Sequence, residues 1–205
     1  MYLKITLMKK ITTIFALFAL FSCKAQQIIV PLGSDNDALD SPNYYIKDVN
    51  SLLDKYVGTW KYTNSNTEVT IVLKKEIHYA TSNNTYYEDL LVGEYQYVKD
   101  GIIIVNTLAD MNNPIIKGYR HKISGGILIS KFNYPACTSC GLDEKRVELF
   151  INHPIEEFAQ GRLVLRHILD VNGERLESHI YDKSTLGDGI VRINIPDGEY
   201  TFIKQ

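Results

Sequence analysis

Apolar and polar positions alternate along most of the chain that follows Trp60. Apolar residues at positions 69, 71 and 73 alternate with Thr70 and Lys74, and the same period of two returns at residues 147–152. Side chains that alternate in this way point to opposite faces, as in a half-buried β-strand. Pairs that favour tight turns interrupt the pattern at Asp100-Gly101, Gly125-Gly126, Asn172-Gly173 and Asp197-Gly198. Because such pairs close hairpins, consecutive strands are expected to be antiparallel neighbours.

The expected strands lie at residues 59–64, 68–74, 76–81, 93–99, 102–108, 118–124, 127–133, 145–152, 162–171, 174–182 and 189–204. Some neighbouring ranges can form one bent strand, so we expect about nine strands in all. Residues 49–57 differ, because their apolar residues fall at helical spacing between Asp48, a plausible N-cap, and Gly58. The pattern therefore predicts an all-β fold with a short N-terminal helix.

The Asn172-Gly173 pair also predicts a register, because a two-residue turn fixes which residues lie opposite each other. The expected pairs are Val171 with Glu174, Asp170 with Arg175, Leu169 with Leu176, and His167 with Ser178. One face of this hairpin then carries Leu163, Leu165, Leu169, Val171, Leu176 and Ile180. An apolar inner face and a polar outer face are what a barrel wall or a sandwich sheet requires.

The first residues have the three zones of a secretory signal. Lysines come first, an apolar run follows at residues 11–21, and Ser22-Cys23 ends the segment. The run is shorter than the roughly 20 residues of a spanning helix, which disfavours a permanent transmembrane segment. The sequence thus predicts a signal peptide at residues 1–22, a tether at 23–46 and one β-barrel domain at 47–205.

Two cleavage sites are compatible with this leader. Residues 20–23 are similar to a bacterial lipobox, which implies that Cys23 carries a lipid that anchors the protein to a membrane of the cell envelope. The alternative is ordinary cleavage after Ala25, which would release a soluble secreted protein. Both cleavage sites predict export. Lipidation at Cys23 would place the protein in the periplasm or at the outer membrane.

Composition excludes several classes of function. The 205 residues include 22 Lys and Arg against 24 Asp and Glu, so the chain lacks the basic excess expected of a nucleic-acid-binding protein. The five histidines are scattered, and no hydrolase, nucleotide-binding or kinase signature is present. We therefore expect no metal, no cofactor and no enzymatic activity.

Cys137 and Cys140 are close in a loop between two expected strands. In an oxidising compartment such a pair favours a disulfide. A thioredoxin-like redox pair, a zinc site and two free thiols are the alternatives, although the first lacks a βαβ context and the second lacks further ligands.

His167 is the histidine that the predicted register places on the apolar face, beside Ser178. A core histidine bonded to that hydroxyl is one interpretation, and a polar contact inside a ligand cavity is the other. Tyr95 and Tyr97 could line the same cavity, although tyrosines also simply suit strands.

Residues 56–62, with Gly58 and Trp60, resemble the G-x-W opening of the lipocalin and fatty-acid-binding superfamily. The resemblance implies an antiparallel up-and-down, lipocalin-like barrel in which Gly58 permits a sharp turn and Trp60 closes one end. It also implies a basic side chain packed over the tryptophan, for which Arg192 or Lys204 is available; Arg192 is our prediction. The helical lid and the Arg-x-Tyr pair of fatty-acid-binding proteins are missing.

Residues 47–62 and 198–204 further resemble an uncharacterised family of small exported bacterial proteins with a lipoprotein-like leader. That resemblance implies no chemistry. The sequence as a whole predicts a non-enzymatic cell-envelope lipoprotein that binds a small apolar or amphipathic ligand inside its barrel. The alternative is a barrel with a filled core that acts as an interaction or inhibitor module through its outer face or the Cys137–Cys140 loop.

Overall fold

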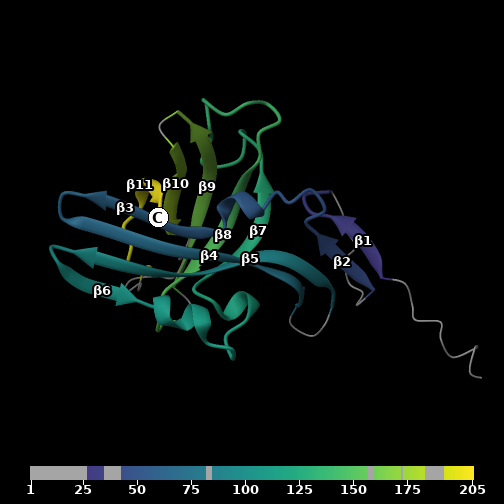
Figure 1. Ribbon diagram of the computed structural model, residues 1–205, viewed down its shortest axis with the longest axis horizontal. Helices are drawn as coiled ribbons and strands as arrows, with labels where there is room; N and C mark the ends of the chain where they lie inside the picture. The colour runs from purple at the N-terminus through teal and green to yellow at the C-terminus, as the bar shows by residue number, and fades with distance from the viewer. Residues whose placement is uncertain (1–26, 35–42, 82–84, 157–158, 172, 183–191) are drawn as a thin grey trace, which may run out of the picture.

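The computed structural model describes residues 27–34, 43–81, 85–156, 159–171, 173–182 and 192–205. Eight antiparallel strands form a closed barrel (Figure 1). They are β3 (Gly58–Asn64), β4 (Thr67–Ala80), β5 (Tyr87–Lys99), β7 (Ile123–Ile129), β8 (Arg146–Asn152), β9 (Gln160–Asp170), β10 (Gly173–Asp182) and β11 (Gly198–Lys204). Each strand pairs with the next along this series, β11 pairs with β3, and β5 pairs with β7. The predicted all-β, up-and-down barrel is confirmed.

Strand β5 has three partners along one edge. Its middle pairs with β7 and closes the barrel, its end pairs with β6 (Ile102–Asn106), and its start pairs in parallel with β2 (Tyr44–Lys47). Strand β1 (Ile28–Pro31) is parallel to β2, so these two strands extend the sheet away from the barrel (Figure 1). Part of the expected tether is therefore ordered, because Tyr45 is buried and its hydroxyl donates to Asp89 of β5.

The expected N-terminal helix is wrong. The segment contains only a 3-10 turn, η1 (Asp54–Tyr56). Asp48 is not its N-cap, which is Leu53, but the Asp48 carboxylate accepts hydrogen bonds from the backbone N–H groups of Leu52 and Leu53 just before the turn. However, Ser51 has a φ of 52°, in the left-handed region, and this interrupts the right-handed path that an α-helix needs.

The segment around Gly125 also differs from the prediction. Instead of a hairpin between two strands, it is one strand, β7, with a bulge between Ser124 and Ile127 where it pairs with β8. A glycine pair suits a bulge as well as a turn, since both require a residue that tolerates positive φ. Before β7, the turns η3 (Leu108–Asn112) and η4 (Gly118–Arg120) follow β6.

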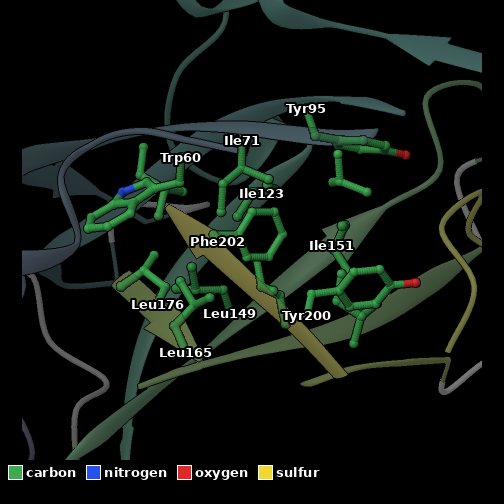
Figure 2. Packing of buried hydrophobic residues seen from close by; sticks show 14 of the residues in the cluster. Trp60, Ile71, Tyr95, Ile123, Leu149, Ile151, Leu165, Leu176, Tyr200 and Phe202 are labelled. Atoms are coloured by element: carbon green, nitrogen blue, oxygen red, sulfur yellow. The ribbon is translucent and has the colours of Figure 1, made fainter. Parts of the chain in front are cut away.

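Packed side chains fill the barrel interior. The inward positions of all eight strands join one cluster of buried hydrophobic residues, in which Trp60, Ile71, Tyr95, Leu149, Leu165 and Phe202 have an exposed fraction of zero. Figure 2 shows Trp60 at one end of the cluster and Tyr95 and Tyr200 at the other. Water does not reach these six side chains. Burying each is worth roughly 1.5–3 kcal/mol.

The β9–β10 hairpin is shifted by two residues from the predicted register. Gly173 lies opposite Asp170, whereas an Asn172-Gly173 turn would place Glu174 opposite Val171. A shift of two keeps every side chain on its predicted face. Leu163, Leu165, Leu176 and Ile180 are accordingly buried, whereas Leu169 and Val171 lie near the tip and are exposed.

Candidate functional site: the disulfide loop and its groove

Trp60 is fully buried at one end of the barrel. Its indole N–H donates to the Tyr56 carbonyl oxygen at 2.8 Å, so the ring is enclosed without an unpaired donor. Gly58 has a φ of 139°, and a Cβ there would lie 3.4 Å from Cε of Lys204. Both residues therefore sit at the closed end.

The basic side chain over Trp60 is Lys204, not the predicted Arg192. The Lys204 ammonium lies 5.1 Å from the centroid of the indole ring. The reason is the register, because Lys204 of β11 lies directly opposite Trp60 of β3. Arg192 is exposed and precedes β11.

His167 and Ser178 do not meet, which corrects the predicted contact. In the shifted register His167 lies opposite Leu176. Its Nε2 is 2.9 Å from the Glu174 carboxylate, while the Ser178 hydroxyl donates to the Tyr200 carbonyl oxygen at 3.1 Å. Hydrogen bonds from Lys204 and His167 lower the pKa of Glu174, so these three side chains form a polar cover near Trp60.

Tyr95 and Tyr97 point into the packed core from β5. The Tyr95 hydroxyl donates to the Asn152 carbonyl oxygen at 3.1 Å, and burial raises the pKa of both phenols. The four residues suggested for ligand binding, His167, Ser178, Tyr95 and Tyr97, therefore do not form one site among the described residues.

Cys137 and Cys140 form a disulfide, with their Cα atoms 5.4 Å apart. It lies in the loop of residues 130–145 between β7 and β8, which we call the disulfide loop. Cys23, the predicted lipidation site, lies outside the described residues.

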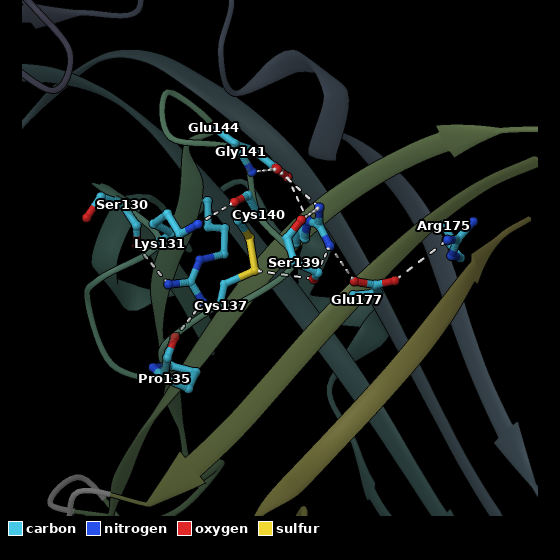
Figure 3. Close-up of polar contacts among 12 residues, drawn as sticks. Ser130, Lys131, Pro135, Cys137, Ser139, Cys140, Gly141, Glu144, Arg175 and Glu177 are labelled. Atoms are coloured by element: carbon cyan, nitrogen blue, oxygen red, sulfur yellow. Dashed lines mark hydrogen bonds and ion pairs between the residues drawn. A yellow bond between two sulfur atoms is a disulfide. The ribbon is translucent and has the colours of Figure 1, made fainter.

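Three basic side chains hold the backbone of the disulfide loop (Figure 3). Arg146 donates to the carbonyl oxygens of Ser130, Asn133 and Pro135 at 2.6–3.0 Å. Lys131 donates to the Cys140 carbonyl oxygen at 3.0 Å, and Arg166 of β9 donates to that of Ser139 at 3.2 Å. The loop thus has several fixed points besides the disulfide.

Arg146 is buried at the base of this loop, with 4% of its surface exposed. Its Nε has no hydrogen-bond partner among the described residues. Burial, and then the nearby Arg166 charge, lower the pKa of Arg146. Arg166 is paired, since its guanidinium lies 2.6 Å from Glu144 and 3.1 Å from Glu177.

A groove of about 400 Å³ lies between the disulfide loop and the outer faces of β9, β10 and β11. Polar side chains, including Arg166, Glu177, His179 and Glu199, contribute to its lining. Tyr134, at one side, packs edge-on against Tyr181 with ring centroids 4.9 Å apart.

The disulfide loop also exposes three large apolar side chains. Phe132, Tyr134 and Leu142 have 77%, 65% and 74% of their surface exposed. Sequence reasoning singled out the cysteines but missed these residues and Arg146. Tyr134 and Leu142 lie outside the expected strands, which was the available signal, whereas Phe132 falls inside the expected strand 127–133. Nothing in the local sequence shows that the Arg146 side chain bonds to the loop.

The described residues contain no group of three or more His, Cys, Asp or Glu side chains that could hold a metal ion. No helix in the same part of the chain is long and apolar enough to cross a membrane.

Comparison with known proteins gives a family but no activity. No curated protein and no solved structure matches the chain. A family profile matches residues 8–205, nearly the whole sequence. The chain therefore belongs to a family of unknown function, DUF6705, as the resemblance to an uncharacterised family predicted.

Proposed function

We propose that this protein is a non-enzymatic, lipid-anchored interaction protein of the cell envelope, and that it binds a partner protein through the disulfide loop. The observation that carries the proposal is a loop fixed at many points that nevertheless exposes Phe132, Tyr134 and Leu142. The partner surface would offer apolar pockets for these three side chains.

The packing of the barrel favours the outer face over the interior. Ligand-binding barrels of this size need a cavity, and the described interior is occupied by a cluster of buried hydrophobic side chains. Of the two functions that the sequence suggested, a filled-core interaction module therefore has more support than an internal ligand site.

The rigidity of the loop supports binding energetically. A loop that is already ordered loses less conformational entropy when a partner binds. Aromatic side chains that are exposed in the free protein are also the usual anchors of protein interfaces. Arg146, Lys131, Arg166 and the disulfide would together provide this pre-organisation.

A photo-crosslinking experiment tests the proposal in intact cells. A photoreactive phenylalanine analogue replaces Phe132 in one variant and Val171 in another. Val171 is also exposed but lies on the β9–β10 hairpin. We expect one discrete crosslinked protein from position 132 and none from position 171. Removing the disulfide by Cys137→Ala with Cys140→Ala should cost about 2 kcal/mol of stability and reduce the crosslink several-fold.

Three results would count against the loop as the binding site: no crosslink from position 132, equal crosslinks from both positions, or no effect of the double cysteine variant. Native mass spectrometry of the purified protein provides a separate check. An apolar molecule that co-purifies reproducibly and remains bound in the double cysteine variant would favour an internal ligand instead.

A further inference from the structure

A second pocket, of about 430 Å³, lies on the outer wall of the barrel, away from the disulfide loop. Ser124 of β7 and Phe150 of β8 belong to its lining, together with Tyr86 and Tyr119 and the amides of Asn152 and Gln160. Two threonines complete it. None of these residues lines the groove beside the disulfide loop. Its volume falls in the range of small-molecule sites.

Tyr119 is held in place from several sides. The preceding residue, Gly118, has a φ of 52°, and a Cβ there would lie 2.1 Å from the Tyr79 ring, so only glycine fits. The Gly118 N–H donates to the Glu76 carboxylate at 2.8 Å, and the Tyr119 phenol is hydrogen-bonded to Glu88. The ring is thus fixed before any ligand binds.

Phe150 is fixed as well. The Arg162 guanidinium lies 3.9 Å from the centroid of its ring, and Tyr119 meets it edge-on with centroids 6.3 Å apart. The Arg162 charge is balanced by Glu148 at 2.9 Å and does not belong to the pocket lining. Phe150 therefore offers an apolar ring to the pocket, and the charge of the neighbouring Arg162 is already paired with Glu148.

Ser124 provides the observation that points to a ligand. Only 1% of its surface is exposed, and its hydroxyl has no hydrogen-bond partner among the described residues. A buried hydroxyl without a partner is costly, so a ligand that hydrogen-bonds to it would recover that cost. Beside it, Gln160 donates to Asn152 Oδ1 at 3.0 Å, a bond that does not use the N–H donors of Asn152.

The lining determines the class of ligand. It contains aromatic rings, hydroxyls and amides but no charged side chain. A charged ligand would lose its hydration without gaining a counter-charge, and a purely apolar ligand would leave Ser124 unpaired. We propose that this pocket binds a neutral saccharide, whose C–H face would pack on Phe150 and whose hydroxyls would pair with Ser124 and Asn152.

Two-dimensional NMR titration of the purified protein tests this site. The probes are glucose, galactose, N-acetylglucosamine and cellobiose. Glucuronate serves as the charged comparison ligand and decanoate as the apolar one. Each is added at up to about 10 mM, because we expect dissociation constants in the millimolar range for a single saccharide site. We expect saturable shifts at the amides of Tyr119, Ser124 and Phe150 with at least one neutral saccharide, and none with glucuronate or decanoate.

Substitutions separate binding from folding. Ser124→Ala should weaken saccharide binding about 3- to 10-fold, the worth of one hydrogen bond, while the unfolding midpoint stays equal or rises. The matched control is Thr107→Val, which removes another buried hydroxyl. That hydroxyl is bonded to the Tyr95 backbone, so stability should fall while binding stays the same.

The inference is overturned if no neutral saccharide gives saturable shifts, if glucuronate or decanoate binds more tightly, or if Ser124→Ala binds as well as the original protein. Because the pocket and the disulfide loop share no lining residue, these results and the crosslinking results are independent of each other.

Discussion

Trp60 shows how one residue closes the barrel. Its ring is fully buried, its N–H is bonded to Tyr56, and the aliphatic stem and ammonium of Lys204 cover it. Glu174 and His167 then hold the polar end of this cover, since Lys204 donates to Glu174 at 2.9 Å. The tryptophan is thus both a core residue and the boundary between core and solvent.

We expect Trp60→Ala to lower the free energy of unfolding by about 3–5 kcal/mol, because it removes the largest buried side chain and leaves a cavity. Urea unfolding measures this change. It is followed by far-UV circular dichroism, because the variant lacks the chain's one tryptophan and so has no tryptophan fluorescence. Lys204→Met keeps most of the apolar cover and should cost less than about 1 kcal/mol. Equal losses in both variants would contradict the assigned roles.

At the same scale, sequence reasoning identified the Gly58 and Trp60 end but chose the wrong cation. The G-x-W pattern is local and can be read directly. The partner depends on which residue of β11 lies opposite Trp60, and nothing within β3 or β11 alone specifies that pairing. His167 and Ser178 were separated for the same reason, because the register of the hairpin is shifted by two residues from the one that the Asn-Gly signal predicts.

Among the elements, the disulfide loop differs most from its surroundings. It is held by side chains of the barrel wall rather than by strand pairing, and Arg166 of β9 contacts both Ser139 and Glu144 of the loop. Glu144 lies on the loop and Glu177 on β10, so Arg166 ties the loop to two strands of the wall (Figure 3). Loss of this contact should loosen the loop while the barrel remains folded.

The Glu144–Arg166 contact predicts a pH dependence. The hydrogen bond from Arg166 lowers the pKa of Glu144 in the folded protein. Its contribution to stability is therefore fully present above the ordinary Glu pKa of about 4.3 and is lost as pH falls through the lower folded value. Glu144→Gln should cost about 1 kcal/mol at neutral pH, and the difference from the original protein should vanish at low pH.

Urea unfolding at a series of pH values from neutral to about 2 measures this dependence. Glu199→Gln is the matched control, because that carboxylate has 88% of its side chain exposed and should change stability little. If Glu144→Gln had a constant effect over the whole pH series, the charge of Glu144 would not be the cause.

At the scale of the whole molecule, the packed core of the closed barrel bears on where a partner or ligand would bind. In the proposed function the described barrel acts through its exterior, where the groove beside the disulfide loop and the Ser124 pocket share no lining residue. Strands β1 and β2 precede the barrel in the chain, and Asp89 holds this segment by accepting from the Tyr45 hydroxyl and the Asp48 N–H. In the proposed function they would set the barrel close to the membrane.

Lipid anchoring at Cys23 gives the prediction at this scale. Radiolabelled palmitate should be incorporated by the original protein and not by Cys23→Ala, and the variant should leave the membrane fraction. Mass spectrometry of the mature N-terminus provides the control. Cleavage after Ala25 with no incorporated label would contradict anchoring and indicate a soluble exported protein.

The sequence by itself determined most of the barrel strands and the burial of Trp60, because a period of two and the residues that favour turns are local properties. It did not determine β1 and β2, or that β7 is one bulged strand. Only the tertiary structure decided that Lys204 covers Trp60, that Arg146 and Arg166 clamp the disulfide loop, and that Ser124 faces a pocket. Each of these joins residues from different strands, and the register between strands depends on how the whole barrel closes.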